Sequence, residues 1–111
     1  MKDSTYVVTG GAGFIGSHIV DLAVKESKKV IVIDNLETGK IKNIDRHLKD
    51  GLIQFFQCDI RNVSDLIEIF PSNSRVIHMA GIGEIVPSVS NPAPYLSVNV
   101  QGTVNVLEAS R

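Results

Sequence analysis

A glycine cluster near the amino end restricts what this chain can fold into more than any other feature. The cluster comprises Gly10, Gly11, Gly13 and Gly16. Residues 6–8 before it, Tyr-Val-Val, are apolar and favour a strand, and a helical apolar pattern begins at Phe14. This order is typical of a strand that enters a tight turn and leaves it directly as a helix.

The helix that follows the glycines leads into a strand that is apolar throughout. The apolar positions of the helix are Ile15, Ile19, Leu22 and Ala23. Their helical period predicts a helix that ends between residues 26 and 28. Residues 30–33 then form a continuous β-branched run that ends at Asp34. Such a run is typical of a strand buried on both faces of a parallel sheet.

The rest of the chain alternates between helical and extended patterns. These predict a short helix near residues 44–48, a strand over 52–58, a helix over 63–70, a strand over 75–79 and a helix over 93–110. Pro71 would end the third helix, and a loop over 80–90 would precede the last one. Asn91 would cap the last helix and Pro92 would occupy its first turn. Leu96, Val100, Thr103 and Leu107 continue at helical spacing through the last helix.

This β-α-β-α-β-α-β-α order predicts an α/β fold with a doubly wound parallel sheet of the Rossmann type. Residues 1–111 are enough for one domain of about four βα units. In the usual order 3-2-1-4 the fourth strand, with Val76 and Ile77, would form an open edge of the sheet. We expect a domain that is truncated at that point.

Composition excludes several classes of partner. The net charge is −1 and like charges form no long run, so we expect no binding of nucleic acid. The longest aliphatic run, residues 30–33, is far too short to span a membrane, and no apolar leader precedes the first strand. We therefore expect a cytoplasmic protein. Cys58 is the single cysteine, which leaves no disulfide or paired zinc ligands to propose.

The glycine spacing at a strand-to-helix junction indicates a dinucleotide site. Gly10 would permit the tight turn, Gly13 would let the backbone approach a pyrophosphate, and Gly16 would let the helix lie close to the sheet. The N–H groups and the dipole at the helix start favour a phosphate there.

Asp34, eighteen residues after Gly16 at the end of the second strand, could accept hydrogen bonds from a ribose. A carboxylate there repels a 2′-phosphate, which favours NAD over NADP. In the alternative interpretation, the glycines form only a turn and Asp34 only caps a loop.

With these residues in place, the sequence resembles the extended short-chain dehydrogenase/reductase family, and within it the nucleotide-sugar epimerases and dehydratases. The matching motifs are TGxxGxxG at residues 9–16, Asp34-Asn35-Leu36 with Thr38-Gly39, Asp59-Ile60-Arg61, His78-Met79-Ala80-Gly81, and the positions Ser88, Pro92, Tyr95, Asn99, Gly102 and Thr103. The residues from 34 to 39 and from 88 to 103 are most similar to UDP-sugar 4-epimerases. The sequence departs from the family at Gly83, where some 4-epimerases have lysine, and at Pro87, where many relatives have arginine.

The resemblance implies a set of residues around NAD. They are Gly10, Gly13, Phe14, Ile15, Gly16, Asp34, Asn35, Leu36, Thr38, Gly39, Asp59, Ile60, Met79, Ala80, Gly81 and Asn99. Backbone N–H groups of Phe14 and Ile15 would face the pyrophosphate, and the segment from Asp34 to Gly39 would surround the adenosine ribose. Asp59 with Ile60 would hold the adenine. The segment 79–81 would line the path to the nicotinamide, and Asn99 would contact the cofactor or order the active site.

By the same resemblance, the implied reaction is hydride transfer at C4 of a UDP-sugar through a 4-keto intermediate, with UDP-glucose as the favoured substrate. UDP-N-acetylglucosamine or UDP-glucuronate 4-epimerization, dTDP-glucose 4,6-dehydration and a non-catalytic dinucleotide-binding module stay open. The family's base is a tyrosine with a lysine four residues later. Here Gly10 follows Tyr6 at that distance and Asn99 follows Tyr95, so we expect these residues to bind cofactor without catalysing. Full-length members of the family would form homodimers.

Four further types of side chain, serine, histidine, cysteine and lysine, each allow both a functional and a purely structural interpretation. Ser88 would contact the substrate, although a loop serine more often caps a turn. For His78, a packed and hydrogen-bonded histidine is favoured over a base or metal ligand, because no other ligand stands at a suitable spacing. Cys58 would pack in the core. Lys40 and Lys42 would be solvated, with a weak role near the adenosine as the alternative.

Overall fold

The structure is a computed structural model that describes residues 5–26, 29–81 and 91–111. Its centre is a four-stranded parallel sheet in the order β3-β2-β1-β4. The strands are β1 (Thr5–Thr9), β2 (Lys29–Asp34), β3 (Ile53–Gln57) and β4 (Ser74–His78). The predicted fold class and strand order 3-2-1-4 are confirmed.

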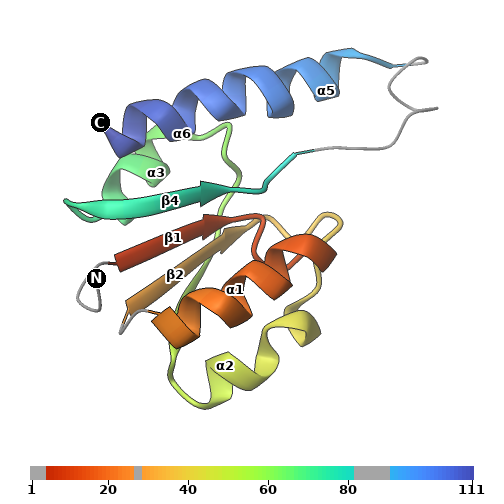
Figure 1. Cartoon of the computed structure of the whole chain (residues 1–111). Coiled ribbons are helices and arrows are strands. Elements are labelled where there is room, and N and C mark those ends of the chain that lie inside the picture. Colours follow the sequence, from red (N-terminus) through yellow and green to blue (C-terminus); the bar gives the residue numbers. More distant parts are fainter. Residues whose placement is uncertain (1–4, 27–28, 82–90) are drawn as a thin grey trace.

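Helices cover both faces of the sheet (Figure 1). One layer contains α1 (Phe14–Glu26), the 3₁₀ turn η1 (Ile41–Asn43) and α2 (Asp45–Lys49). The other layer contains α3 (Val63–Ile69) and a long last helix built from α5 (Ala93–Leu96), the π-helical turn η2 (Ser97–Gln101) and α6 (Gly102–Ser110). The sheet is therefore doubly wound, as the alternation of elements predicts.

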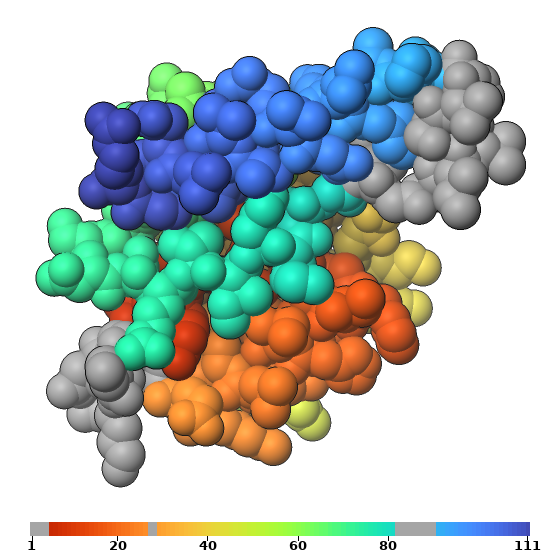
Figure 2. Space-filling model, turned by 45° about the horizontal axis from the view of Figure 1, so that its top comes forward, coloured from red at the N-terminus to blue at the C-terminus, as the bar shows by residue number. Residues whose placement is uncertain are grey.

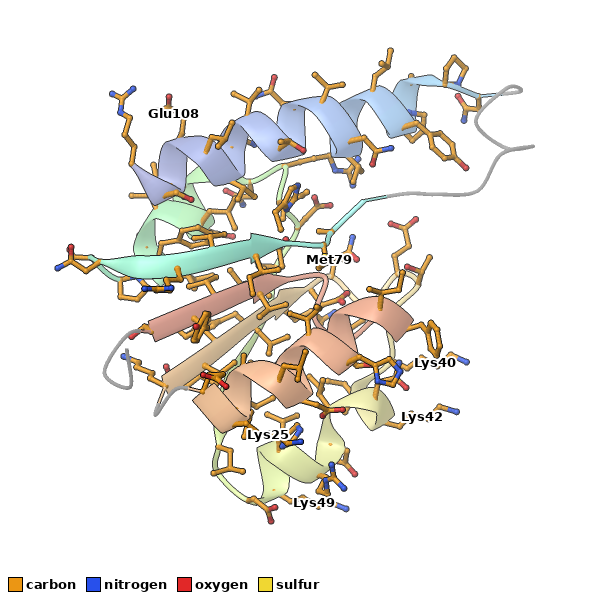
Figure 3. All side chains as sticks on the ribbon, in the orientation of Figure 1. Lys25, Lys40, Lys42, Lys49, Met79 and Glu108 are labelled. Carbon is orange, nitrogen blue, oxygen red and sulfur yellow. The ribbon has the colours of Figure 1, made fainter. Side chains whose placement is uncertain are left out.

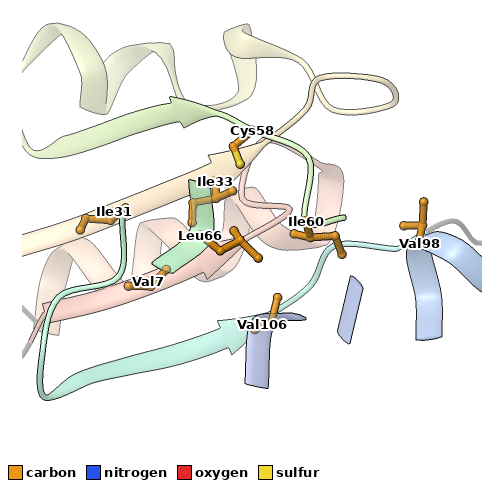
Figure 4. Packing of buried hydrophobic residues seen from close by; sticks show 8 residues of the cluster. All are labelled: Val7, Ile31, Ile33, Cys58, Ile60, Leu66, Val98 and Val106. Carbon is orange, nitrogen blue, oxygen red and sulfur yellow. The ribbon is translucent and has the colours of Figure 1, made fainter. Parts of the chain in front are cut away.

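Alternate residues of β2 pack into two separate cores. Ile31 and Ile33 face α3 and the last helix, where they meet Leu66 (Figure 4). Val30 and Val32 face the layer of α1 and α2. Because successive side chains of a strand point to opposite faces, a strand between two helical layers must be apolar at every position. This explains the uninterrupted β-branched run at residues 30–33.

The predicted apolar face of α1 is right at Ala23, which is buried, and at Ile19, which packs partly buried against the core, but it is wrong at Ile15 and Leu22. Ile15 and Leu22 are each 60% exposed, whereas the buried residues of α1 are Gly16, Val20 and Ala23. The tight turn before the helix decides this orientation, because it brings Gly16 against its own backbone. Residues four and seven positions later then point the same way, toward the sheet.

The prediction for the last helix is right in extent and wrong in two details. Pro92, not Asn91, occupies the cap position, and no side-chain hydrogen bond caps the helix there. Leu96, Val100 and Leu107 are each more than half exposed. The buried residues of this helix are Val98, Gly102, Asn105 and Val106. A π-helical turn inserts one residue into the helical period, which changes the buried face in a way that regular spacing does not predict.

β4 has a strand neighbour on one side only among the described residues. Figure 2 shows β4 at the surface, in teal, between the last helix in blue and α1 in orange. The prediction of an open edge at β4 is therefore confirmed. In the described part of the chain, no helix is both long and apolar enough to cross a membrane.

Candidate functional site

The carboxyl ends of the strands meet at a cavity of about 490 Å³. Open parallel sheets bind ligands at this edge, and the volume lies in the range of small-molecule sites. Met79 stands at this edge, where the chain leaves β4 (Figure 3). The cavity is lined by Gly10, Gly13, Ile33, Asp34, Asn35, Glu37, Thr38, Cys58, Asp59, Ile60, Met79, Ala80, Gly81, Asn91, Pro94, Tyr95 and Val98.

Most of the predicted cofactor residues line this one cavity. Those that do are Gly10, Gly13, Asp34, Asn35, Thr38, Asp59, Ile60, Met79, Ala80 and Gly81. Six predicted residues lie outside the lining: Phe14, Ile15, Gly16, Leu36, Gly39 and Asn99. Ser88, Gly83 and Pro87 lie outside the described residues.

The sequence prediction missed Glu37, which lies within the segment from Asp34 to Gly39, and Val98 of the last helix. It also missed two groups of lining residues. Ile33 and Cys58 directly precede the predicted Asp34 and Asp59, so their position beside the strand ends was a usable signal. Asn91, Pro94 and Tyr95 come from the start of the last helix. The packing of that helix across the strand ends brings them to the cavity. For Tyr95, its place among the matching family positions was a usable signal, whereas Asn91 and Pro94 had none.

Gly10 has the conformation and the surroundings of a position that only glycine can occupy. Its φ is +70°, and its N–H donates to the Ile33 carbonyl oxygen at 2.7 Å. A Cβ at Gly10 would lie 2.7 Å from the Ala80 backbone nitrogen. The predicted tight turn is thus confirmed, and the close approach of the segment after β4 adds a second reason for glycine.

Gly16 also has no room for a side chain, but not for the predicted reason. A Cβ there would overlap the carbonyl oxygen of Gly10. The close contact is therefore between α1 and the glycine turn, rather than between α1 and the sheet. At Gly13 the nearest atom to an added Cβ would be the same oxygen at 3.4 Å, so this position borders the cavity without crowding.

Phe14 and Ile15 are the first two residues of α1. Their side chains are largely exposed, and the Phe14 ring packs edge-on against His18 with centroids 5.2 Å apart. The intrahelical ladder begins with the Ser17 N–H, which donates to the Gly13 carbonyl oxygen at 2.9 Å. N–H groups before that point belong to the first helical turn, which leaves them available to an anion.

Asp34 is a buried carboxylate that fastens the glycine turn to the end of β2. Its Oδ2 accepts from the Ala12 N–H at 3.0 Å, and its Oδ1 accepts from the Leu36 N–H at 2.8 Å. A Cβ at Gly39 would lie 2.7 Å from Oδ2, so Gly39 leaves room for this carboxylate. The loop-capping interpretation of Asp34 is therefore observed. Each carboxylate oxygen can accept a second hydrogen bond, so a ligand can still bond to Asp34 from the cavity.

The loop after β2 is tied to the same turn through the carbonyl oxygen of Ala12. It accepts from the Lys40 N–H at 3.0 Å and from the Asn43 side-chain amide at 2.7 Å. Leu36 has a φ of +64°, which supports the sharp change of direction after Asp34. The side chains of Lys40 and Lys42 point away from the sheet into solvent, as the favoured interpretation predicts (Figure 3).

Asp59 is held as an anion by Arg61. The guanidinium donates to both carboxylate oxygens, with the shortest distance of 2.6 Å from an Nη to Oδ2, and the Arg61 N–H donates to Oδ1 at 2.9 Å. These bonds, chiefly that of the Arg61 side chain, hold the pKa of Asp59 below its usual value, and a hydrogen bond from Asn35 lowers it further. Asp59 thus offers acceptor oxygens to the cavity at neutral pH.

Asn105, which the sequence prediction missed, clamps the segment that carries Asp59 and Ile60. Its buried side-chain amide donates to the carbonyl oxygens of Ile60 and Arg61, both at 3.0 Å. One turn earlier, a Cβ at Gly102 would lie 2.5 Å from Cδ1 of Ile60. The last helix can therefore approach this segment closely enough for the hydrogen bonds to form.

His78 is a packed, hydrogen-bonded histidine, as predicted. Its Nδ1 lies 2.6 Å from Oγ1 of Thr9, and its Nε2 lies 3.0 Å from Oγ1 of Thr103. Burial lowers the pKa of its imidazole. Across the described ranges, no group of three His, Cys, Asp or Glu side chains could hold a metal ion.

Cys58 packs in the core between β3 and α3, as predicted. It is 9% exposed, and its burial raises the pKa of the thiol. The acidic neighbours Asp65 and Asp59 raise it further. A thiol with a raised pKa carries little thiolate at neutral pH, which agrees with a packing role.

With this geometry established, the sequence was compared with known proteins. Residues 6–111 match the NAD dependent epimerase/dehydratase family. The chain belongs to this family. A relative from Methanocaldococcus jannaschii, provisionally named UDP-glucose 4-epimerase, is 44% identical over 107 residues, which cover 95% of this chain and 33% of that protein. The resemblance inferred from the motifs is thereby confirmed, and so is NAD as the cofactor of the family.

Solved structures of epimerases superpose closely on this member of the family. UDP-N-acetylglucosamine 4-epimerase from Methanobrevibacter ruminantium, in complex with UDP-N-acetylmuramic acid, gives a TM-score of 0.86 at 35% identity over 98% of this chain and 34% of that one. UDP-glucose 4-epimerase from Thermus thermophilus, in complex with NAD, gives 0.80 at 39% identity over 95% of this chain and 33% of that one. This chain spans about a third of the length of these relatives.

Replacing Asn105 with alanine tests the clamp on the segment from Asp59 to Arg61. Asn105→Ala leaves two carbonyl oxygens without their donor, and we expect it to lower the free energy of unfolding by about 1–3 kcal/mol. We also expect faster hydrogen exchange in the segment from Asp59 to Arg61. Urea denaturation and exchange mass spectrometry measure the two effects.

Glu108→Ala is the matched control, because Glu108 lies on the outer side of the same helix (Figure 3). It should change stability by less than about 0.5 kcal/mol. Equal losses in the two variants would contradict the clamp.

Proposed function

We propose that these residues form the NAD-binding part of a nucleotide-sugar epimerase. The observation that carries this proposal is the meeting of four distant segments at one cavity: the glycine turn, Asp34, the Asp59-Ile60 pair and residues 79–81. Each segment lies at the carboxyl end of a different parallel strand: Asp34 ends β2, and the other three follow β1, β3 and β4. A dinucleotide, which has two nucleoside ends joined by a charged bridge, requires such an elongated arrangement of different contacts.

The residues around the cavity fit the parts of NAD. The start of α1, with the backbone N–H groups of Phe14 and Ile15, would bind the pyrophosphate. Asp34 and Asn35, assisted by the backbone of Leu36 and by Thr38, would hold the adenosine ribose. Gly39 would contribute by leaving space for the Asp34 carboxylate. Asp59 would accept from the exocyclic amine of adenine, beside the backbone of Ile60.

At the other end, Met79, Ala80 and Gly81 would line the nicotinamide half, and Asn99 would act beside Gly81. A Cβ at Gly81 would lie 3.1 Å from Oδ1 of Asn99, so the Asn99 side chain is a neighbour of Gly81, and this supports the proposal. Gly10, Gly13 and Gly16 would keep the turn compact enough for the cofactor to lie across the strand ends.

The charges at the cavity favour NAD over NADP. Among the described lining residues, the charged side chains are Asp34, Glu37 and Asp59, and all three are acidic. The nearby Arg61 is bound to Asp59, and Lys40 and Lys42 point into solvent. An additional phosphate on the adenosine ribose would therefore meet repulsion that no described lining cation offsets.

Titration calorimetry with NAD and NADP on the full-length protein tests cofactor binding and selectivity. We expect NAD to bind at least about tenfold more tightly than NADP, a difference of about 1.4 kcal/mol. Asp34→Ala should weaken NAD binding by a similar factor, whereas Asp50→Ala, which removes an exposed carboxylate after α2, should not change it.

Asp34→Ala removes a charge and also the hydrogen bonds that hold the glycine turn. Glu37→Gln therefore tests the effect of charge alone on cofactor selectivity. It removes one carboxylate at an exposed position and should narrow the preference for NAD over NADP. Equal binding of the two cofactors to the unmodified protein would contradict the proposed site.

The proposed reaction is the interconversion of a UDP-sugar and its C4 epimer, with UDP-glucose as substrate. NAD supplies a hydride acceptor that takes hydrogen from the sugar and returns it. Neither Tyr6 nor Tyr95 is followed by a lysine four residues later, so we assign to these residues the binding and orientation of the cofactor, not proton transfer. Ser88 would contact the substrate. The name of the Methanobrevibacter relative supports UDP-N-acetylglucosamine as a second candidate substrate.

Incubation of the full-length protein with UDP-glucose, followed by NMR of the sugar, tests this reaction. We expect UDP-galactose to accumulate to a constant ratio with UDP-glucose. UDP-N-acetylglucosamine, UDP-glucuronate and dTDP-glucose, run in parallel, separate the other 4-epimerases and the 4,6-dehydratase. If the protein binds NAD but converts none of these sugars, the remaining interpretation is a non-catalytic dinucleotide-binding module.

We also propose that the full-length protein is a homodimer that pairs through the outer face of the last helix. Exposed apolar side chains line this face: Leu96, Val100, Val104 and Leu107. A two-fold axis places the same surface on both copies, and an apolar stripe is complementary to itself. Large apolar side chains exposed at successive turns of one helix favour an interaction site there.

Light scattering after size-exclusion chromatography tests the dimer. We expect the full-length protein to elute at twice its chain mass and Leu107→Glu to shift it toward the monomer, because a buried unpaired charge opposes pairing. Glu108→Gln, at the neighbouring position, should leave the dimer intact. A monomeric unmodified protein would contradict the proposal.

A further inference from the structure

His78 connects three elements that meet at the nicotinamide end of the cavity. It lies at the end of β4, contacts Thr9 at the end of β1 through Nδ1, and contacts Thr103 at the start of α6 through Nε2. Its role depends on which ring nitrogen carries the hydrogen, and the surrounding hydrogen bonds decide that.

At Thr9, the neighbours require the hydroxyl to donate to His78. Oγ1 of Thr9 lies within hydrogen-bond distance of the N–H groups of Met79 (3.1 Å) and Ala80 (3.2 Å), both of which can only donate. The Met79 N–H is shared, because it also donates to the Thr9 carbonyl oxygen at 2.9 Å. The hydroxyl has one hydrogen and two lone pairs. With both lone pairs facing N–H groups, its hydrogen points to Nδ1 of His78 at 2.6 Å. Nδ1 must then carry no hydrogen.

At Thr103, the neighbours lead independently to the same tautomer. The Thr103 hydroxyl donates to the carbonyl oxygen of Asn99 at 2.7 Å. Its hydrogen is therefore used, and Oγ1 can only accept from Nε2 of His78 at 3.0 Å. Both contacts are satisfied by one state, a neutral imidazole with hydrogen on Nε2. The lowering of the histidine pKa by burial agrees with a neutral ring.

The Thr103 hydroxyl bonds to the π-helical turn that carries Asn99. A π-helical turn shifts its carbonyl groups out of the regular helical ladder, and here the Asn99 carbonyl oxygen accepts a side-chain hydrogen bond. The side chain of Asn99 lies beside Gly81, which itself lines the cavity. The series of contacts thus runs from Thr9, at the end of β1, through His78 and Thr103 to Asn99.

We propose that His78 is a positioning residue, which acts as a neutral Nε2–H imidazole between Thr9 and Thr103 to hold Asn99 at the Gly81 end of the cavity. The inference rests on the proposed NAD site for its effect on cofactor binding, whereas the tautomer of His78 is independent of that site. The same ring fixes the Thr9 hydroxyl, which holds the N–H groups of Met79 and Ala80.

The first measurement is a long-range ¹H–¹⁵N correlation spectrum of the full-length protein with ¹⁵N-labelled histidine. The His78 signals are assigned by their absence in His78→Gln. We expect hydrogen on Nε2 and none on Nδ1 at neutral pH. Hydrogen on Nδ1, or on both nitrogens, overturns the proposal, and this measurement needs no variant beyond the one used for assignment.

The second measurement compares NAD affinities by calorimetry. Thr103→Val keeps the shape of the side chain and removes the hydroxyl, so we expect the Kd for NAD to rise about fivefold, the loss expected for one net hydrogen bond. Thr103→Ser keeps the hydroxyl and should bind NAD as the unmodified protein does. An unchanged Kd in Thr103→Val overturns the proposal.

Repeating Thr103→Val in an Asn99→Ala background separates positioning from general structural support. If Thr103 acts through Asn99, the valine substitution should not raise the Kd further once the Asn99 side chain is gone. Additive effects would overturn the proposal. If the unmodified protein does not bind NAD, the proposed function fails, while the tautomer spectrum still tests the geometry at His78.

Discussion

The absence of a side chain at Gly10 is the constraint on which the rest of this structure depends. The backbone of Gly10 bonds to the end of β2, touches the chain leaving β4, and receives the start of α1 against its carbonyl oxygen. Its left-handed conformation and these close contacts could not coexist with a Cβ. Three elements thus converge on one backbone unit. The ends of β1, β2 and β4 and the start of α1 therefore occupy fixed relative positions, which define the cavity between them.

Polar side chains, rather than apolar packing, set the fine geometry of this edge of the sheet. Asp34 fixes the glycine turn, Asn105 fixes the segment from Asp59 to Arg61, and Thr9 with His78 fixes the segment after β4. Each of these groups is bonded to backbone or to another side chain, and buried polar groups are tolerated when satisfied in this way. A cavity held by such bonds has its shape before any ligand enters, which lowers the entropic cost of binding.

The order and type of the elements could be predicted because they depend on local patterns. The uninterrupted run at residues 30–33, the glycine cluster and the helical periods each identify their element directly. The orientation of the helices could not be predicted so well. In α1 and the last helix, apolar residues such as Leu22 and Leu107 face outward, so apolar spacing identifies a helix without identifying its buried side. The inserted residue of the π-helical turn is a second reason, because it rotates the buried face of the last helix partway along its length.

The sequence by itself determined the Rossmann-type fold, the cavity edge and most of its lining, because glycine spacing, strand pattern and the acidic residues at strand ends are local properties. The family match agrees with that prediction. Only the tertiary structure decided that Asn105 reaches Ile60, that Gly16 rests on Gly10, and that His78 stands between Thr9 and Thr103. The contacts of Asn105 and His78 join residues far apart in the chain, and their partners are fixed by how the elements pack rather than by any neighbouring residue. The contact of Gly16 with Gly10 is local, but it depends on the path of the turn between them.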